Sequence, residues 1–177
     1  KTSLIPKKIN YFSDNDIKIK KLISGSNFSF VIDNKEKIYS FGDNSCEQLA
    51  RETINFAAYS KPAEANFLNN FGKIKQIKLG WSFGAFLNEF GEVYVWGNIF
   101  LDYKKALNLK DVKIPNNIFL KKENINNIKF TEIESGFSHL LIIGENEDSK
   151  KEILYSYGSN ELVKYFFLLL KLLFIFM

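Results

Sequence analysis

The sequence predicts an all-β fold: three β-sheet units, each laid out like one blade of a β-propeller and together forming an incomplete ring. Hydrophobic residues make up 46% of the chain, and 18 Phe and 8 Tyr dominate the aromatics. Ile, Val and Phe recur in short runs bounded by Gly, Asn and Asp, a composition that favours strands. Two glycine-containing motifs also recur three times, about 55 residues apart, which indicates a repeat architecture.

The first motif is a short run that begins with an aliphatic residue and ends on a glycine. It occupies residues 22–25, 77–80 and 133–136, so that its glycines are Gly25, Gly80 and Gly136. We expect one strand to end at each of these glycines. An apolar run follows each time, at 28–32, 83–87 and 139–143, and predicts the second strand of each unit.

The second motif is an aliphatic or β-branched residue, Tyr, a small or β-branched residue, an aromatic and Gly. It occupies 38–42, 93–97 and 154–158, with Tyr39, Tyr94 and Tyr155 in second place, Trp96 as the aromatic of the second copy, and Gly42, Gly97 and Gly158 at the end. Side chains alternate along a strand, so the tyrosine and the aromatic share one face. We expect that face to pack against the neighbouring unit, and the glycines to allow a tight turn or a close backbone approach.

Turns and prolines complete each unit. Residues 33–36 and 88–91 carry Asn, Asp or Gly, which tolerate positive φ, and so predict hairpin turns. In the third copy about five extra polar residues at 145–151 predict an insertion in a surface hairpin loop. The three prolines fall one per copy and should mark where an edge strand or connecting loop begins; they are Pro6, Pro62 and Pro115.

These signals divide the chain into three repeats, at about 5–50, 61–98 and 114–162, and a hydrophobic tail at 163–177. The apolar part of the tail has about 13 residues with Lys171 among them, fewer than the roughly 20 that span a bilayer. Three interpretations of the tail remain open. It is the product of a truncated gene model or of read-through, a core strand or helix, or a segment that lies on a membrane surface.

The charge pattern does not predict nucleic-acid binding. The formal net charge is +4 and the pI about 9.0, but Arg51 is the only arginine, whereas readout of phosphates and bases relies heavily on arginine forks. The lysines are dispersed among Asp and Glu, which indicates a solvated surface. Cys46 is the only cysteine, so we expect no internal disulfide and a reducing compartment. No secretory leader is expected either.

No catalytic, cofactor-binding or metal-ligating residue is predicted. The sequence has no nucleophile elbow, phosphate loop or His-Glu-x-x-His motif. The lone His139 enters an apolar run and is expected to be structural. The residues singled out as sites are therefore the structural repeat residues: Gly25, Gly42, Gly80, Gly97, Gly136, Gly158, Tyr39, Tyr94, Tyr155 and Trp96. The chain is not expected to be an enzyme.

Over about residues 5–162 the motifs resemble those of the regulator-of-chromosome-condensation repeat family. Residues 93–97 are closest to the family's Val-Tyr-x-Trp-Gly strand, and Asn44, Gln48 and Leu49 match the segment that follows it in the family. The family's histidine, three residues after the first glycine, is present only as His139. The resemblance implies a seven-bladed propeller of which this chain holds three degenerate blades, with further repeats outside it or supplied by another molecule.

The resemblance also implies what the protein does. Our leading hypothesis is a propeller that serves as a protein-interaction scaffold, because blades present variable loops on a rigid frame. The alternative is a guanine-nucleotide exchange factor for a Ran-type small GTPase that associates with chromatin. A further alternative is the propeller part of a larger ubiquitin ligase or kinase. We expect a protein partner, a small GTPase among the candidates, with chromatin suggested by resemblance alone, no membrane partner, no cofactor, and an intracellular location in cytoplasm or nucleus.

Overall fold

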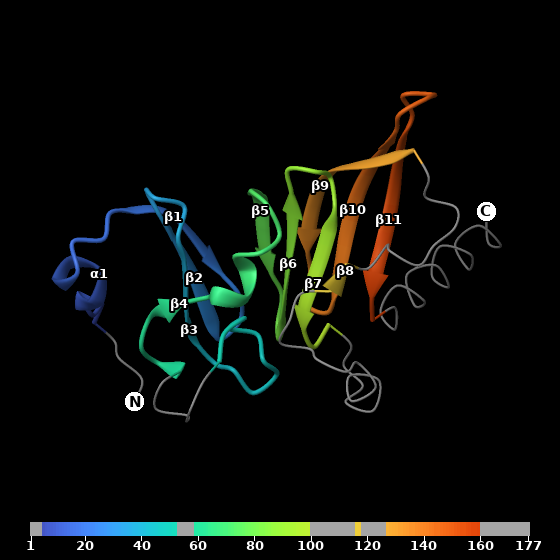
Figure 1. The fold of residues 1–177 in the computed structure, drawn as a ribbon. Coiled ribbons are helices and arrows are strands. Elements are labelled where there is room, and N and C mark those ends of the chain that lie inside the picture. Colours follow the sequence, from blue (N-terminus) through green and yellow to red (C-terminus); the bar gives the residue numbers. More distant parts are fainter. Residues whose placement is uncertain (1–4, 53–58, 100–115, 118–126, 160–177) are drawn as a thin grey trace.

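Three antiparallel β-sheets lie side by side along the chain (Figure 1). The structure is a computed structural model and describes residues 5–52, 59–99, 116–117 and 127–159. The sheets follow one another in chain order and do not close into a ring. The predicted all-β fold and incomplete propeller are therefore confirmed. The expected tail at 163–177 and Pro115 lie outside the described residues.

Each sheet is a meander of neighbouring strands. Blade 1 has the order β1 (Ile19–Ser24), β2 (Phe28–Asp33), β3 (Ile38–Gly42) and β4 (Ala63–Glu64). Blade 2 repeats it with β5 (Ile74–Leu79), β6 (Phe83–Asn88), β7 (Val93–Gly97) and β8 (Asn116–Asn117). Blade 3 consists, within the described residues, of β9 (Ile128–Ser135), β10 (His139–Asn146) and β11 (Glu152–Gly158).

The boundaries of the sequence repeats do not coincide with the boundaries of the β-sheets. Residues 63–64, placed by the repeat pattern at the start of the second copy, form β4 and pair with β3, where Tyr39 lies opposite Glu64. The boundary expected at residue 61 thus falls within the first sheet. Pro62 stands directly before this edge strand, where the lack of an N–H donor does not interrupt the ladder.

One polar side chain organises the turn after the second strand of each blade. The carboxylate Oδ1 of Asp33 accepts hydrogen bonds from the backbone N–H groups of Lys35 (2.8 Å) and Lys37 (2.9 Å). The amide Oδ1 of Asn88 accepts from the same two positions in blade 2, and that of Asn146 accepts from the N–H groups two and three residues ahead in blade 3. Such turns are formed by Asx side chains that bond to the backbone two residues ahead.

The insertion in the third copy lengthens a hairpin more than its loop. β10 has 8 residues against 6 in β2 and β6, and β11 has 7 against 5 in β3 and β7. Four of the five extra residues therefore extend the strands. The expectation that all five form a surface loop is wrong in this respect, because they continue the antiparallel ladder as far as the pair Glu145–Glu152. The β10–β11 hairpin rises above its neighbours in Figure 1.

A short helix covers the outer side of blade 1. α1 (Asn10–Asp14) lies next to the first sheet (Figure 1), and its Phe12 packs edge-on against Tyr39 with ring centroids 5.7 Å apart. The sequence motifs did not indicate this helix. A second short element, the 3-10 helix η1 (Asn66–Leu68), inserts Leu68 into the core between blades 1 and 2.

The two faces of each sheet take part in different cores. Phe83, Ala85 and Leu87 of β6 point toward blade 3, whereas Phe86 between them points toward blade 1. This follows from the alternation of side chains along a strand. Burial of both faces explains why β6 carries no polar side chain from Phe83 to Leu87. The described residues thus form one core in each seam between blades, together with a small third core between α1 and blade 1.

Candidate interaction surface

The opening glycines of the three blades have the same environment. A Cβ on Gly25 would lie 2.5 Å from the ring of Phe28, one on Gly80 2.0 Å from Phe83, and one on Gly136 2.2 Å from His139. The ring three residues ahead therefore folds back over the glycine in every copy. A planar ring is the shared requirement, which Phe meets as well as His. His139 accordingly fills the position of a packed aromatic.

The closing glycines also share one environment. Gly42, Gly97 and Gly158 all have positive φ, at 116°, 75° and 119°. A Cβ on Gly97 would lie 2.6 Å from the carbonyl oxygen of Ser82, and the other two glycines face the equivalent carbonyls of Asn27 and Ser138. The chain leaves the third strand there, in a conformation that residues with a Cβ rarely adopt.

The tyrosine and the aromatic two residues later face the preceding unit in each blade. Tyr94 and Trp96 pack into the core with blade 1, and Tyr155 with Tyr157 packs into the core with blade 2. In blade 1 the corresponding Tyr39 and Phe41 pack against α1. Tyr39 is therefore buried, Tyr94 and Tyr155 are partly buried against their cores, and the structure does not gather the three tyrosines into one site.

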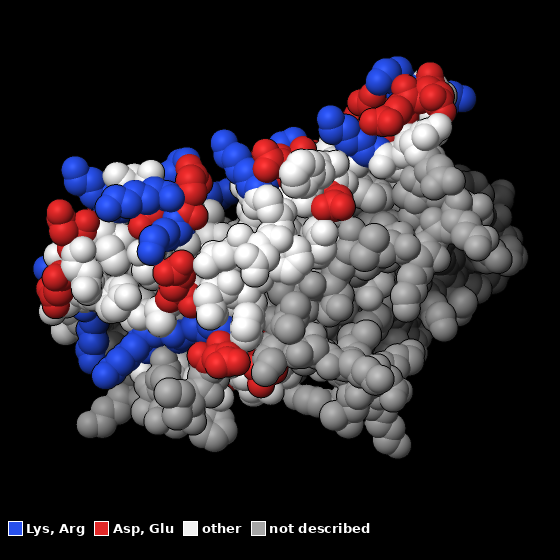
Figure 2. Space-filling model, viewed as in Figure 1, with Lys and Arg blue, Asp and Glu red and all other residues white. Residues whose placement is uncertain are grey.

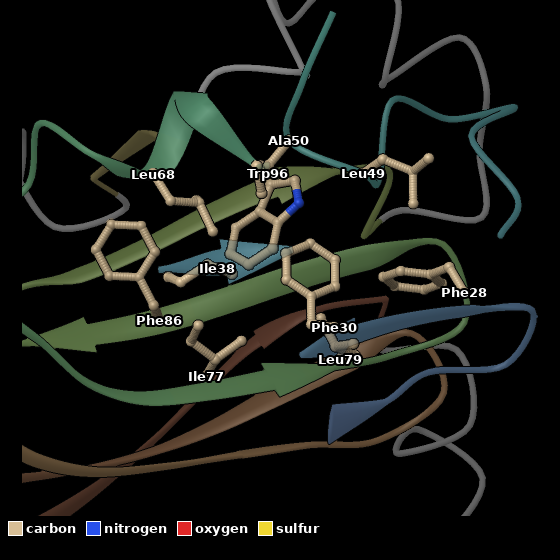
Figure 3. Packing of buried hydrophobic residues seen from close by; sticks show 11 residues of the cluster. Phe28, Phe30, Ile38, Leu49, Ala50, Leu68, Ile77, Leu79, Phe86 and Trp96 are labelled. Carbon is tan, nitrogen blue, oxygen red and sulfur yellow. The ribbon is translucent and has the colours of Figure 1, made fainter. Parts of the chain in front are cut away.

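Trp96 lies at the centre of the seam between blades 1 and 2. Figure 3 shows its indole among side chains of both blades, with Phe30, Leu49 and Ala50 on one side and Phe86 on the other. It is 1% exposed. On its own sheet the ring covers Gly84, where a Cβ would lie 2.1 Å from the indole. The sequence analysis did not anticipate this role of Gly84.

The loop after β3 is held by the side chains that match the family motif. Asn44 Oδ1 accepts a hydrogen bond from the N–H of Leu49 at 2.8 Å, and Gln48 Oε1 accepts one from the N–H of Cys46 at 2.8 Å. Ser40 donates from Oγ to the Leu49 carbonyl at 2.7 Å. These bonds fold the loop into the seam. Cys46 is buried there.

Two exposed aromatic side chains stack on each other at the blade 2–blade 3 seam. Trp81 and Phe137 follow the opening glycines of their blades, and their rings lie 4.9 Å apart with an interplanar angle of 13°. Trp81 is 37% exposed and Phe137 54%. The backbone N–H of Trp81 donates to the carbonyl of Phe137 at 2.9 Å. This pair was not predicted from the sequence, although a large aromatic residue directly follows two of the three opening glycines.

Hydrogen bonds hold the backbone around the two stacked residues in place. The loop residue Ser82 is buried and donates from Oγ to the carbonyl of Asn98 at 2.7 Å. Ser135 donates from Oγ across the seam to the carbonyl of Leu79 at 2.9 Å. Two apolar rings are thus held in water without a covering element among the described residues. Exposed aromatics on a fixed frame are typical anchors for protein partners.

Charged side chains of both signs are spread over the surface, and several of them form ion pairs. Lys37 Nζ lies 3.3 Å from Glu64, and Lys150 Nζ lies 3.1 Å from Glu145; Lys20 pairs with Glu36 and Lys78 with Glu134. Figure 2 shows basic and acidic side chains interspersed on the face it presents. This agrees with the expectation of a solvated, mixed surface. Exposed pairs of this kind contribute about 0–1 kcal/mol each.

The described part of the chain contains no cluster of three or more His, Cys, Asp or Glu side chains suited to a metal ion. Within the same residues, no helix combines the length and hydropathy needed to cross a bilayer.

Sequence comparison finds relatives that carry the same repeats. No protein-family model matches the chain. It is 28% identical over 176 residues to an RCC1 domain-containing protein of Dictyostelium discoideum, covering 88% of this chain and 34% of that protein. It is also 29% identical over 83 residues to an RCC1-like G exchanging factor-like protein of Mus musculus, covering 46% of this chain and 18% of that protein.

Solved structures share the fold. Prp20p of Saccharomyces cerevisiae superposes with a TM-score of 0.68 and 19% identity, over 88% of this chain and 36% of that one. Human WBSCR16 superposes with a TM-score of 0.61 and 22% identity, over 82% and 35% of the two chains. This chain therefore spans about a third of the length of the Dictyostelium relative and of both solved structures. In sequence and in fold it resembles the RCC1-like repeat proteins, and its described residues form part of a β-propeller of that type.

Proposed function

We propose that this chain supplies three blades of a non-catalytic RCC1-like propeller that serves as a scaffold for protein partners. The exposed Trp81–Phe137 stack carries the proposal, since it places two rigid aromatic anchors on one edge of the sheets. Binding by such a scaffold depends on surface shape and needs no reactive group. The similar Prp20p, described for its binding to Gsp1p and histones and also solved with Kap60, supports a protein as the class of partner.

The outward face of blade 3 supports the presence of further blades. Leu154 of β11 is 68% exposed, whereas its counterparts in the other third strands, Ile38 and Val93, are 7% and 0% exposed. Those two side chains are buried because another blade packs on them. A further repeat, placed against β10 and β11 in the same way, would cover Leu154 and the half-exposed Leu141.

The proposal is tested by photo-crosslinking in the full-length protein. A benzophenone amino acid at Phe137 should crosslink to a defined partner in extract from the source cells. The same amino acid at Phe90, which is 67% exposed at the opposite end of the sheet, is the matched control. The adduct should be lost when Trp81→Ser is added. Absence of an adduct at 137, or an identical adduct at 90, would contradict the stack as a binding site.

An assay of nucleotide release distinguishes the scaffold proposal from the alternative that the protein is a guanine-nucleotide exchange factor. The scaffold proposal predicts that the purified protein does not accelerate release of labelled GDP from a Ran-type GTPase. Acceleration that saturates with protein concentration would replace the proposal by the exchange activity.

A further inference from the structure

A groove runs along the seam between blades 1 and 2, at the edge opposite to the Trp81–Phe137 stack. Two adjoining hollows of about 250 Å³ and 320 Å³ share the side chains of Ile32, Glu36, Lys73 and Ile74. Ile74 begins β5, whereas Trp81 follows its end. The two surfaces therefore lie at opposite ends of the blade 2 strands. The two hollows lie just below and just above the lower end of the roughly 300–1,000 Å³ range of small-molecule pockets, so each suits a group about the size of one side chain.

The groove has an apolar floor and a basic rim. Ile38 and Leu68 are buried beneath it, while Ile32 and Ile74 remain partly exposed to water. The charged side chains that line the two hollows are four lysines and one glutamate: Lys20, Lys21, Lys73, Lys75 and Glu36. All five are exposed, and Glu36 is paired with Lys20. Lys21, Lys73 and Lys75 have no ion pair among the described residues.

In the seam between blades 2 and 3, side-chain hydrogen bonds join the first strands of the two blades at the positions that correspond to this groove. Gln76 of β5 accepts a hydrogen bond from the N–H of Ile133 at 3.0 Å and donates to the carbonyl of Thr131 at 3.4 Å, both in β9. Gln76 lies opposite Leu87, and in blade 1 the residue at this register is Lys21, opposite Ile32. The ammonium group of a lysine donates hydrogen bonds but cannot accept one. Lys21 therefore cannot make the bond that Gln76 receives, and the blade 1–blade 2 seam stays open there.

We propose that this groove binds an acidic segment of a partner protein, with an apolar side chain of that segment seated on the isoleucine floor. Carboxylates would pair with the unpaired lysines, and an aliphatic side chain would cover Ile32 and Ile74. Since Glu36 is paired with Lys20, the remaining charges of the lining are all positive, and such a cleft attracts groups of the opposite charge. The apolar floor and the lack of arginine in the lining favour a peptide over a nucleic acid, whose phosphates would leave the floor exposed. The inference rests on the proposed scaffold function but concerns a separate surface.

The test is fluorescence anisotropy with the full-length protein at low salt. The probe is a short fluorescein-labelled peptide with one leucine flanked on both sides by aspartates and glutamates. The double variant Lys21→Gln with Lys75→Gln should bind it about five- to tenfold more weakly. The matched control is Lys129→Gln with Lys151→Gln, which removes the same charge from exposed positions outside the groove. Control binding should equal that of the parent.

Four results would overturn the inference: no binding by folded parent protein, equal loss in both double variants, equal affinity for a peptide with serine in place of leucine, or tighter binding of an oligouridylate than of the peptide. Circular dichroism establishes that each variant is folded. Failure of the groove is distinguishable from failure of the scaffold function, because crosslinking at Phe137 reports on the other edge. If Phe137 crosslinks to a partner but the peptide does not bind, the groove proposal is refuted and the scaffold function stands.

Discussion

The indole Nε1 of Trp96 donates a hydrogen bond of 2.9 Å to the backbone carbonyl of Gln48. This bond joins the third strand of blade 2 to the loop that follows the third strand of blade 1. Its donor belongs to the tyrosine–aromatic motif of one repeat, and its acceptor belongs to the Asn–Gln–Leu segment of the repeat before it. Two sequence features that lie in neighbouring copies of the repeat are thus two halves of one contact between blades.

Truncation of Trp96 should be among the most destabilising single changes in the chain. Trp96→Ala should lower the free energy of unfolding by about 3–5 kcal/mol, because it empties the centre of a core and leaves the Gln48 carbonyl without its donor. Urea denaturation followed by circular dichroism measures the loss. The control Phe90→Ala removes a side chain that is 67% exposed and should change stability by no more than about 0.5 kcal/mol. A similar value for both would refute the core position of Trp96.

A methyl group at Gly80 should be destabilising because the ring of Phe83 occupies its place. The Cβ would lie 2.0 Å from Phe83 Cε1, so Gly80→Ala should cost about 1–3 kcal/mol. A double-mutant cycle with Phe83→Leu tests the cause. If ring contact is responsible, Gly80→Ala should cost less in the Phe83→Leu background than in the parent. Additive losses would show that the glycine matters for another reason.

The turn residue Asn88 should depend on both ends of its amide. Its Oδ1 accepts from the N–H groups of Phe90 at 3.1 Å and Glu92 at 2.9 Å, and its Nδ2 donates to the carbonyl of Phe71 at 3.0 Å and to the carboxylate of Glu92 at 2.7 Å. Asn88→Ala removes all four bonds in a buried side chain and should cost about 1–3 kcal/mol. Asn88→Asp keeps the acceptor but turns a second carboxylate toward Glu92. Adding Glu92→Gln should therefore recover part of the stability that Asn88→Asp loses in thermal denaturation, and no recovery would contradict the donor role of Nδ2.

Alkaline pH should weaken the contact between α1 and blade 1. Burial raises the pKa of the Tyr39 phenol above its ordinary value of 10.0, and the nearby Asp33 carboxylate raises it further. The folded state therefore holds this proton more tightly than the unfolded state does. The associated stability is present below about pH 10 and is lost as pH rises through the folded-state pKa. In Tyr39→Phe, unfolding free energies measured from about pH 9 to 11 should fall less steeply than in the parent; parallel curves would count against this role.

The repeat motifs predicted the blades well for a physical reason. Strand alternation and turn chemistry are local, so positions 38–42, 93–97 and 154–158 could be assigned to third strands, with Tyr and the following aromatic on one face, without knowledge of the partner. The structure places these segments in β3, β7 and β11. The expectation that the inserted residues of the third copy form a loop was wrong for most of them, because polar residues can extend an exposed antiparallel ladder as readily as they form a loop.

The sequence by itself determined the number of copies, the first three strands of each and the face that carries the aromatics, because these depend on residues a few positions apart. Only the tertiary structure decided what covers each face. It placed α1 on blade 1, brought Trp81 onto Phe137 and left Lys21 where the next blade has Gln76 bridging its seam. These contacts join residues about 25 to 60 positions apart, and they exist only once the sheets pack side by side.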